Sequence, residues 1–271
     1  MQELTLFDED DHETSGPSGP LVRVRLTIAY DGTDFRGLAQ NADVRTVVGE
    51  LMRVLTPLFG SAPDIVMSGR TDAGVHAAHQ VLSFDAPEDK VDLEQISNVI
   101  NQRLGPEIVA IDVVLAAPEF SARFDATGRR YRYRILNRPA PDPFSARFAW
   151  WVPQRLNLAV MQLACDPFLG EQDFSSFCKR PKVRPGEEPV SLVRRVTEAR
   201  WIKSGDGELV FEIAGSAFCH HMVRSIVGFH VAVGRGKRSV GEVRSVLAAR
   251  DRQAAEQPAP PHGLTLVEVA Y

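Results

Sequence analysis

Residues 21–30, LVRVRLTIAY, alternate apolar and polar side chains along their whole length. Apolar or aromatic residues occupy every second position from Val22 to Tyr30, and Arg23, Arg25 and Thr27 lie between them. Because successive side chains of a strand point to opposite faces of a sheet, this pattern predicts a half-buried strand. This strand is the first element of the order that decides the fold.

A regular order of elements follows this strand. Residues 46–59 carry apolar side chains at helical spacing, with Thr46 as the expected N-cap and with Pro57 expected to distort the last turn. The later patterns predict short strands near 65–67 and 81–84, a helix over 92–103 capped by Asp92, and a strand over 108–115. The order strand, helix, strand, strand, helix, strand is that of a ferredoxin-like split βαβ unit.

The rest of the chain mixes helices and strands in the same way. A strand over 131–136 can continue the first sheet, and a proline-rich joint at 137–144 follows it. Beyond the joint we expect helices near 155–165, 218–233 and 239–250, and strands near 190–202, 208–214 and 264–270. The sequence therefore predicts an α+β protein of two ferredoxin-like halves, residues 21–140 and 141–271, which share a mixed sheet with a cleft between them.

Composition and charge limit the class of protein. The 271 residues carry a formal net charge of −4, but residues 1–20 hold six acidic residues and no Lys or Arg, and we expect them to form a disordered acidic tail. No apolar run approaches the ~20 residues of a membrane span. Residues 121–138, SARFDATGRRYRYRILNR, hold six arginines and one acid with two tyrosines between them, as an RNA-binding surface would. A protein with a generally arginine-rich composition could show as many arginines here without binding RNA. The composition therefore does not establish an RNA partner.

The three cysteines are few and scattered. Cys165, Cys178 and Cys219 show no CxxC spacing, and their odd number argues against a disulfide framework and against a zinc site. The acidic N-terminus does not have the form of a secretory signal. Together these features favour a protein of the reducing cytoplasm.

A tight polar loop, SGRTDAGVHAAH, occupies residues 68–79. Asp72 lies between two glycines and beside Arg70, and a carboxylate kept charged by a guanidinium is a competent nucleophile or base. The alternative is an Asx-turn with a surface ion pair. His76 and His79 have a spacing that a metal site can use, but without a third ligand a core or turn-stabilising role is favoured.

A second polar cluster interrupts an apolar stretch, FCHHMVRSIVGFH, at residues 218–230. Arg224 lies in the middle of the expected buried helix, where an unpaired charge is costly, so it needs a partner such as Asp72. The alternative is that Arg224 reaches solvent along its own stem. His220 and His221 are adjacent, so on a helix they would point about 100° apart and form a poor chelating pair.

Taken together, these stretches resemble the tRNA pseudouridine synthase A family. The matching segments are YDGTDFRG (30–37), GRTDAGVHA (69–77), ARFDATGRRYRY (122–133), DFSSF (173–177), HHMVRSIVG (220–228) and GLTLVEV (263–269). The resemblance implies two ferredoxin-like halves around a mixed sheet, a homodimer, and no metal or cofactor. It also implies an isomerase that converts uridine to pseudouridine at positions 38, 39 and 40 of the tRNA anticodon stem-loop. The base leaves its sugar at N1, rotates, and is rejoined through C5.

The same resemblance assigns roles to individual residues. Asp72 matches the essential aspartate, Arg224 its basic partner, and Tyr131 the ring that stacks under the target base and takes the C5 proton directly or indirectly. Arg70 matches the arginine that helps fill the space left by the flipped nucleotide, and Leu264 matches the apolar residue on the other side of the base. Whether Asp72 attacks C1′, attacks C6 or removes the C2′ proton is left open.

The basic cluster adds two expected RNA contacts. Arg129 and Arg130 are expected to contact tRNA phosphates.

The sequence departs from the family pattern at one place, where Leu38 and Ala39 replace the usual Trp-Gln pair. Two other functions stay open: a non-catalytic tRNA-binding or tRNA-folding module on the same fold, and a small-molecule enzyme that uses GRTDAG as a phosphate loop. The second is disfavoured because GxxxxGK[ST] and GxGxxG are absent from the sequence.

Overall fold

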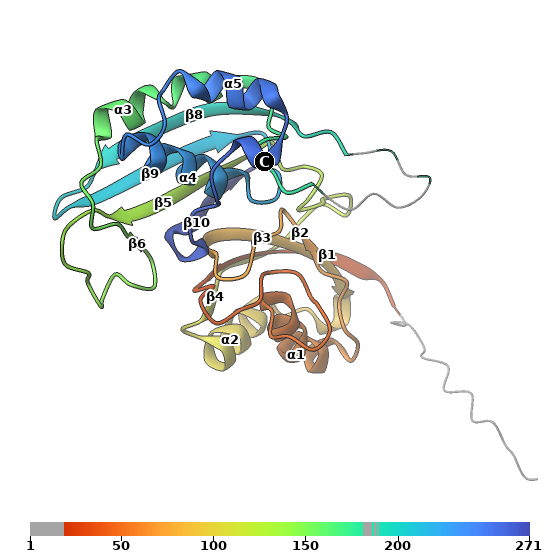
Figure 1. Cartoon of the computed structure of the whole chain (residues 1–271). Helices are drawn as coiled ribbons and strands as arrows, with labels where there is room; N and C mark the ends of the chain where they lie inside the picture. The colour runs from red at the N-terminus through yellow and green to blue at the C-terminus, as the bar shows by residue number, and fades with distance from the viewer. Residues whose placement is uncertain (1–18, 181–185, 187, 189) are drawn as a thin grey trace, which may run out of the picture.

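The computed structural model describes residues 19–180, 186, 188 and 190–271 (Figure 1). The expected acidic tail, residues 1–20, lies outside this part of the chain except for its last two residues. The strands of the described part are β1 Leu21–Tyr30, β2 Val66–Met67, β3 His76–Pro87, β4 Ile108–Leu115, β5 Gly128–Leu136, β6 Trp150–Trp151, β7 Gly170–Asp173, β8 Val193–Lys203, β9 Glu208–Gly215 and β10 Leu264–Ala270. The α-helices are α1 Val47–Phe59, α2 Leu93–Leu104, α3 Leu158–Leu163, α4 Met222–Gly234 and α5 Glu242–Ala249.

All the strands belong to one mixed sheet. Its order is β4-β1-β3-β10-β5-β9-β8-β7, with β2 paired to β3 and β6 paired to β5. The last strand of the chain, β10, lies at the centre, parallel to β3 and antiparallel to β5. The C-terminal strand therefore joins the sheet of the first half to that of the second.

Two hydrophobic cores lie on this sheet. One holds buried residues of β1, β3, β4, α1 and α2, and the other holds residues of β5, β8, β9, α3, α4 and α5. Figure 1 shows the helices in the same two groups, α1 with α2 and α3 with α4 and α5. Tyr131 of β5 packs against both. This arrangement confirms the expected α+β class with two halves around a mixed sheet. The division at residue 140 stays a prediction, and β5, which precedes it, pairs with β9 and β10.

Local sequence signals explain the first two helices. The Thr46 hydroxyl accepts a hydrogen bond from the Gly49 N–H at 3.2 Å, and the Asp92 carboxylate accepts one from the Gln95 N–H at 2.9 Å. Both N-caps are confirmed. Pro57 lies in the last turn of α1, which still extends to Phe59.

The structure also corrects several expected boundaries. β3 begins at His76 rather than near residue 81, because this central strand is buried on both faces and shows no simple alternation. α4 begins at Met222 rather than 218, because His221 has a left-handed backbone with φ of 67° and cannot continue a helix. The short strands β6 and β7 were not expected. No helix of the described chain is long and apolar enough to cross a membrane.

Candidate active site

The loop that carries Asp72 is held against the segment that follows β1. The Leu38 N–H donates to the Thr71 carbonyl at 3.3 Å, and the Tyr30 hydroxyl lies 2.7 Å from the Thr71 hydroxyl. A side chain at Gly32 would place its Cβ 1.9 Å from the Val75 carbonyl oxygen, so only glycine permits this close approach. The DGT and DAG turns, which begin at residues 31 and 72, therefore hold each other in place.

His76 joins further segments to this loop. Its Nδ1 accepts a hydrogen bond from the Gly32 N–H at 3.0 Å, and its Nε2 lies 3.0 Å from the Arg147 carbonyl and 3.1 Å from the His262 carbonyl. Burial lowers the pKa of His76, which favours the neutral ring that these bonds require. The turn-stabilising role expected for His76 is confirmed, and exposed His79 does not take part in these contacts.

Asp72 and Arg224 form the ion pair that the sequence suggested. The Arg224 Nη1 donates to Asp72 Oδ2 at 2.9 Å, although the two residues are 152 positions apart. The Arg224 Nε donates to the Ala259 carbonyl at 2.8 Å, so the guanidinium is held by the backbone as well. Both side chains are mostly buried. A guanidinium this close, and partly shielded from water, stabilises the negative charge of the carboxylate.

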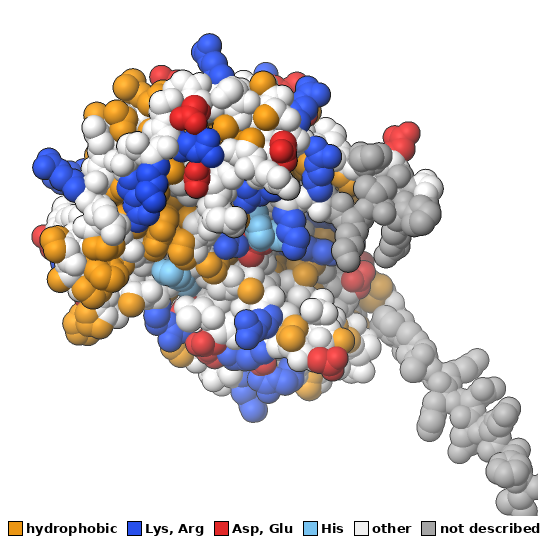
Figure 2. Space-filling view, in the orientation of Figure 1, with side chains coloured by type: hydrophobic (Ala, Val, Ile, Leu, Met, Phe, Trp, Pro, Cys, Tyr) orange, Lys and Arg blue, Asp and Glu red, His pale blue; other side chains and the backbone are white. Residues whose placement is uncertain are grey.

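Two histidines complete the surroundings of the carboxylate. His220 Nε2 lies 3.1 Å from Asp72 Oδ1, whereas His221 Nε2 lies 3.5 Å from Oδ2, the oxygen that Arg224 already contacts. Burial lowers the pKa of His221 to about 4, so this ring is neutral near pH 7. Each carboxylate oxygen therefore has its own close partner, Arg224 for one and His220 for the other. Figure 2 shows histidine side chains beside Lys or Arg side chains in the hollow between the two parts of the molecule.

These two histidines were expected inside a helix, where their side chains would point apart, and this expectation was wrong. They lie before it, and the left-handed backbone of His221 turns both rings toward Asp72. Within the described part of the chain, one cluster of side chains could hold a metal ion: Asp72, His220 and His221. Their ligand atoms lie within 4.8 Å of one another. The positive charge of Arg224 on the same carboxylate opposes a bound cation. The absence of a metal stays a prediction.

An aromatic wall adjoins the charged group. Tyr131 of β5 is half-buried, and the ring of Phe218 packs edge-on against it with centroids 5.2 Å apart. Burial, opposed by Arg129 and reinforced by the charge of Asp72, raises the pKa of Tyr131 to about 12. Leu264, the first residue of β10, is buried in the core against which Tyr131 packs. The tyrosine is therefore a neutral phenol near pH 7, close enough to the carboxylate to sense its charge.

The arginines expected to bind RNA differ in what they contact. Arg70 is exposed. Arg129 turns inward and donates to the carbonyls of Ala126, Ser216 and Ser68, at 3.2, 2.8 and 2.6 Å. This guanidinium thus holds three loops together around the site.

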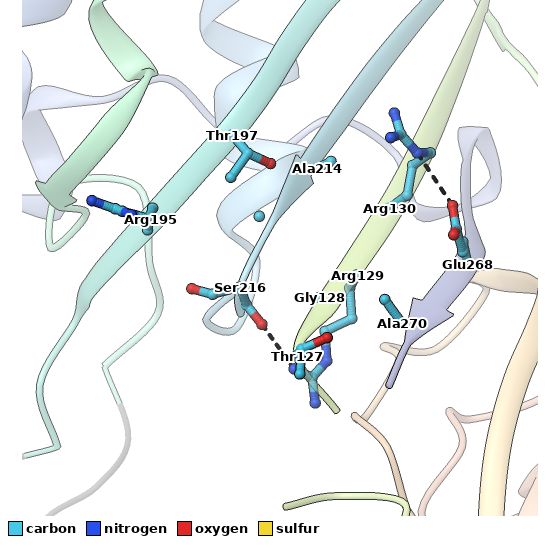
Figure 3. A pocket seen from close by; sticks show the side chains of 11 residues that line it. Thr127, Gly128, Arg129, Arg130, Arg195, Thr197, Ala214, Ser216, Glu268 and Ala270 are labelled. Carbon is cyan, nitrogen blue, oxygen red and sulfur yellow. Dashed lines mark hydrogen bonds and ion pairs between the residues drawn. The ribbon is translucent and has the colours of Figure 1, made fainter. Parts of the chain in front are cut away.

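Arg130 points to the opposite face of the sheet. It pairs with Glu198 at 2.6 Å and with Glu268 at 3.4 Å. Figure 3 shows the bonds from Arg129 to Ser216 and from Arg130 to Glu268 beside a cavity of about 300 Å³. Asp72 does not line that cavity.

The structure also joins two cysteines. Cys178 and Cys219 form a disulfide, with Cα atoms 5.8 Å apart, while Cys165 is free and buried. The expectation of no disulfide was wrong for this pair, since a separation of 41 residues without a motif gives no signal in the sequence. The neighbouring Lys179 N–H donates to the His220 carbonyl at 2.9 Å, so this contact helps to position His220.

Comparison with known proteins agrees with this geometry. The family model described as tRNA pseudouridine synthase matches residues 26–125 and 164–271, well over half of the chain. The chain belongs to the tRNA pseudouridine synthase family.

Relatives named tRNA pseudouridine synthase A match over nearly their whole length. The protein from Brevibacillus brevis is 41% identical over 251 residues, which cover 93% of this chain and 100% of that one. The Bacillus subtilis protein is 39% identical over 252 residues, covering 92% and 99% of the two chains, and the Fervidobacterium nodosum protein is 38% identical over 249 residues, also covering 92% and 99%. Among solved structures, a Cbf5-Nop10-Gar1 complex matches 90% of this chain and 48% of that one at 13% identity, with a TM-score of 0.33, too low to support an argument.

Leu38, where the sequence departs from the family pattern, occupies a position in the hydrophobic core. Leu38 is fully buried among the residues of the first core, and Ala39 is partly exposed. The backbone of Leu38 still bonds to Thr71 of the Asp72 loop. An apolar side chain is therefore sufficient at this position to keep the loop in place.

Proposed function

We propose that the protein isomerises uridine to pseudouridine in tRNA, at positions 38, 39 and 40 of the anticodon stem-loop. The observation that carries the proposal is the arrangement of Asp72, with one oxygen on Arg224 and the other on His220, beside the half-buried ring of Tyr131. The names of the relatives and of the family support tRNA as the substrate.

The reaction begins with removal of the uridine from its stack. A base within a helix does not expose C1′ or C5 to a side chain, so the nucleotide must be extruded, at a cost of a few kcal/mol. Exposed Arg70 is placed two residues before Asp72 in the same loop, where it can fill the space that the base leaves and offset part of this cost.

The bond changes then balance within one nucleotide. The N1–C1′ bond breaks, a C5–C1′ bond forms, C5 loses its proton, and N1 gains one. Asp72 is the charged group that acts at C1′, at C6 or at the C2′ proton. No oxidant, reductant or second substrate is needed.

We assign Tyr131 and Leu264 the role of holding the detached base. A base that is free of its sugar must rotate without leaving, and an aromatic ring on one side with an apolar side chain on the other can hold it. Because the raised pKa keeps Tyr131 protonated, its hydroxyl can accept the C5 proton only while it passes its own proton onward. We therefore assign Tyr131 an indirect role in removing that proton.

Further properties belong to the same proposal. The chain acts as a homodimer in the cytoplasm, where its tRNA substrate is present, and needs no cofactor. It is an isomerase of the intramolecular transferase class. Support for these points comes from the family resemblance.

The deciding experiment measures tritium release from tRNA labelled with [5-³H]uridine. We expect release by the intact protein and none by Asp72→Ala, with Asp64→Ala, an exposed aspartate outside the site, as the matched control. Undiminished release by Asp72→Ala would refute the role of Asp72. Binding of tRNA by the intact protein without release would favour the non-catalytic module instead.

A further inference from the structure

Phe124 is a water-exposed aromatic side chain in the loop that precedes β5, the strand that carries Tyr131. Its ring is 79% exposed, and within residues 120–127 it is the one large apolar side chain with such exposure. Single exposed apolar residues are common on protein surfaces, so exposure alone carries no conclusion. The surroundings of Phe124 decide what the ring can do.

The loop that carries Phe124 is fixed by its own hydrogen bonds. The Ser121 N–H donates to Asp125 Oδ2 at 2.9 Å, and the Asp125 N–H donates back to the Ser121 carbonyl at 3.1 Å. Buried Ala122 donates its N–H to the buried Ser83 hydroxyl at 3.0 Å. The ring is therefore presented to solvent by an ordered backbone whose polar groups have partners.

The same loop is tied to the loop of Arg70. The Arg129 guanidinium donates to the Ala126 carbonyl at 3.2 Å and to the Ser68 carbonyl at 2.6 Å. Ala126 lies two residues after Phe124, and Ser68 lies two residues before Arg70. One side chain thus fixes both loops at the edge of the site.

Positive charge accompanies the ring. The Arg123 guanidinium lies 5.4 Å from the centroid of the Phe124 ring, and within the part of the chain that the structure describes no side-chain hydrogen bond or ion pair holds it. By contrast, Arg130, Arg132 and Arg134 of the following strand all pair with glutamates. Arg123 is therefore available to an anionic ligand, whereas those arginines are already neutralised.

We propose that Phe124 and Arg123 form a stacking platform for an unpaired nucleotide that neighbours the flipped uridine. The inference rests on the proposed function and adds a place where the RNA is held outside the catalytic group. Any base has a π face that can stack on a phenylalanine ring, and a guanidinium takes the adjoining phosphate. When a nucleotide leaves the stack, its neighbour loses a stacking partner, and the ring replaces that partner.

A second copy of the chain is the other conceivable occupant of this surface. A stable interface between copies buries a wide apolar surface, but Arg123, Asp125 and Thr127 around the ring are exposed and polar. The isolated ring with a free guanidinium is better suited to a nucleotide than to a protein surface.

The experiment compares Phe124→Ala, Phe124→Leu and Phe124→Tyr with the intact protein, using an unmodified tRNA transcript. Fluorescence anisotropy gives Kd, tritium release gives KM and kcat, and a thermal melt confirms folding. The matched control is Phe144→Ala, which removes an even more exposed ring, at 92%, from another loop. We expect Kd and KM to rise roughly tenfold for Ala and Leu, and less than about twofold for Tyr and for the control.

The outcomes separate this inference from the proposed function. Equal Kd and KM for Phe124→Leu and the intact protein, with tritium release retained, would overturn the platform and leave the function standing. Binding that depends on Phe124 without any tritium release by the intact protein would overturn the proposed function and leave the ring only as a contact for a tRNA base. A change in sedimentation coefficient for the variants without tRNA would assign the ring to contact between copies and overturn the platform.

Discussion

Arginine and tyrosine side chains on the two faces of β5 have different surroundings. On the face toward the helices, Arg129 holds three loops, Tyr131 adjoins the charged group, and Tyr133 is fully buried. On the opposite face the arginines form ion pairs across the sheet: Arg130 with Glu198 and Glu268, Arg132 with Glu212, and Arg134 with Glu208. The alternating RRYRYR sequence thus places Tyr131 beside the Asp72 group on one face and ion-paired arginines on the other. The number of arginines is a poor guide to an RNA surface unless their partners are known.

The largest expected effect tests the inner face with two matched tyrosines. Tyr131→Phe should lower kcat about 100-fold or more, because it removes the hydroxyl that we propose relays the C5 proton. Tyr133→Phe should leave kcat nearly unchanged and lower stability by about 1 kcal/mol, since its hydroxyl only donates to the Pro260 carbonyl at 2.8 Å. Single-turnover tritium release and urea unfolding measure the two effects. Equal kcat values for Tyr131→Phe and Tyr133→Phe would contradict a catalytic role for the Tyr131 hydroxyl.

The second prediction concerns charge inside the same core. His230 is fully buried, accepts a hydrogen bond from Trp201 Nε1 at 3.0 Å, and burial lowers its pKa to about 4. Because the unfolded chain binds this proton with a pKa near 6.5, stability is complete above that pH and is lost as pH falls toward 4. The loss from this group is on the order of 3 kcal/mol at the low end of the window.

Urea unfolding between pH 7 and pH 4 measures this loss. His230→Gln should be less stable at pH 7 but show a shallower decline, because the titrating ring is gone. His76, His221 and His262, whose pKa values are also lowered by burial, keep part of the slope in both proteins. An identical slope in the variant would mean that His230 does not contribute to the acid sensitivity.

The order of elements was predictable from the sequence, but the site was only partly so. Alternation in residues 21–30 and N-caps at Thr46 and Asp92 are local signals, and the structure has those elements where they were expected. The Asp72–Arg224 pair was predictable too, because a charge within an apolar stretch needs a partner.

Contacts that depend on tertiary position were missed. His220 contacts Asp72 from the segment before α4, which ends in the left-handed residue His221, and no pattern of neighbours indicated that backbone. The glutamates that neutralise the outer arginines lie 68 to 138 residues from their partners, beyond any local period. The inward turn of Arg129 likewise depends on three loops that only the fold brings together.

The third prediction compares the two histidines at the carboxylate. His220→Ala should lower kcat about tenfold with KM unchanged, because Asp72 Oδ1 loses the partner that fixes its orientation. His221→Ala should have a smaller effect, since Arg224 still holds the oxygen that it contacts. His220→Asn, which keeps a donor, should recover part of the loss. A larger effect from His221 would contradict the division of the two oxygens between His220 and Arg224.

The smallest expected effect tests the two classes of arginine directly. Arg70→Gln should weaken tRNA binding several-fold at low salt and lower the slope of log Kd against log salt by about one, as expected for the loss of one phosphate contact. Arg134→Gln should leave the slope unchanged, because Glu208 already pairs with that guanidinium. Filter binding over a range of salt concentrations gives both slopes. An equal reduction for the two variants would show that tRNA displaces the glutamates and reaches the outer face, in which case the ion-paired arginines would belong to the RNA surface after all.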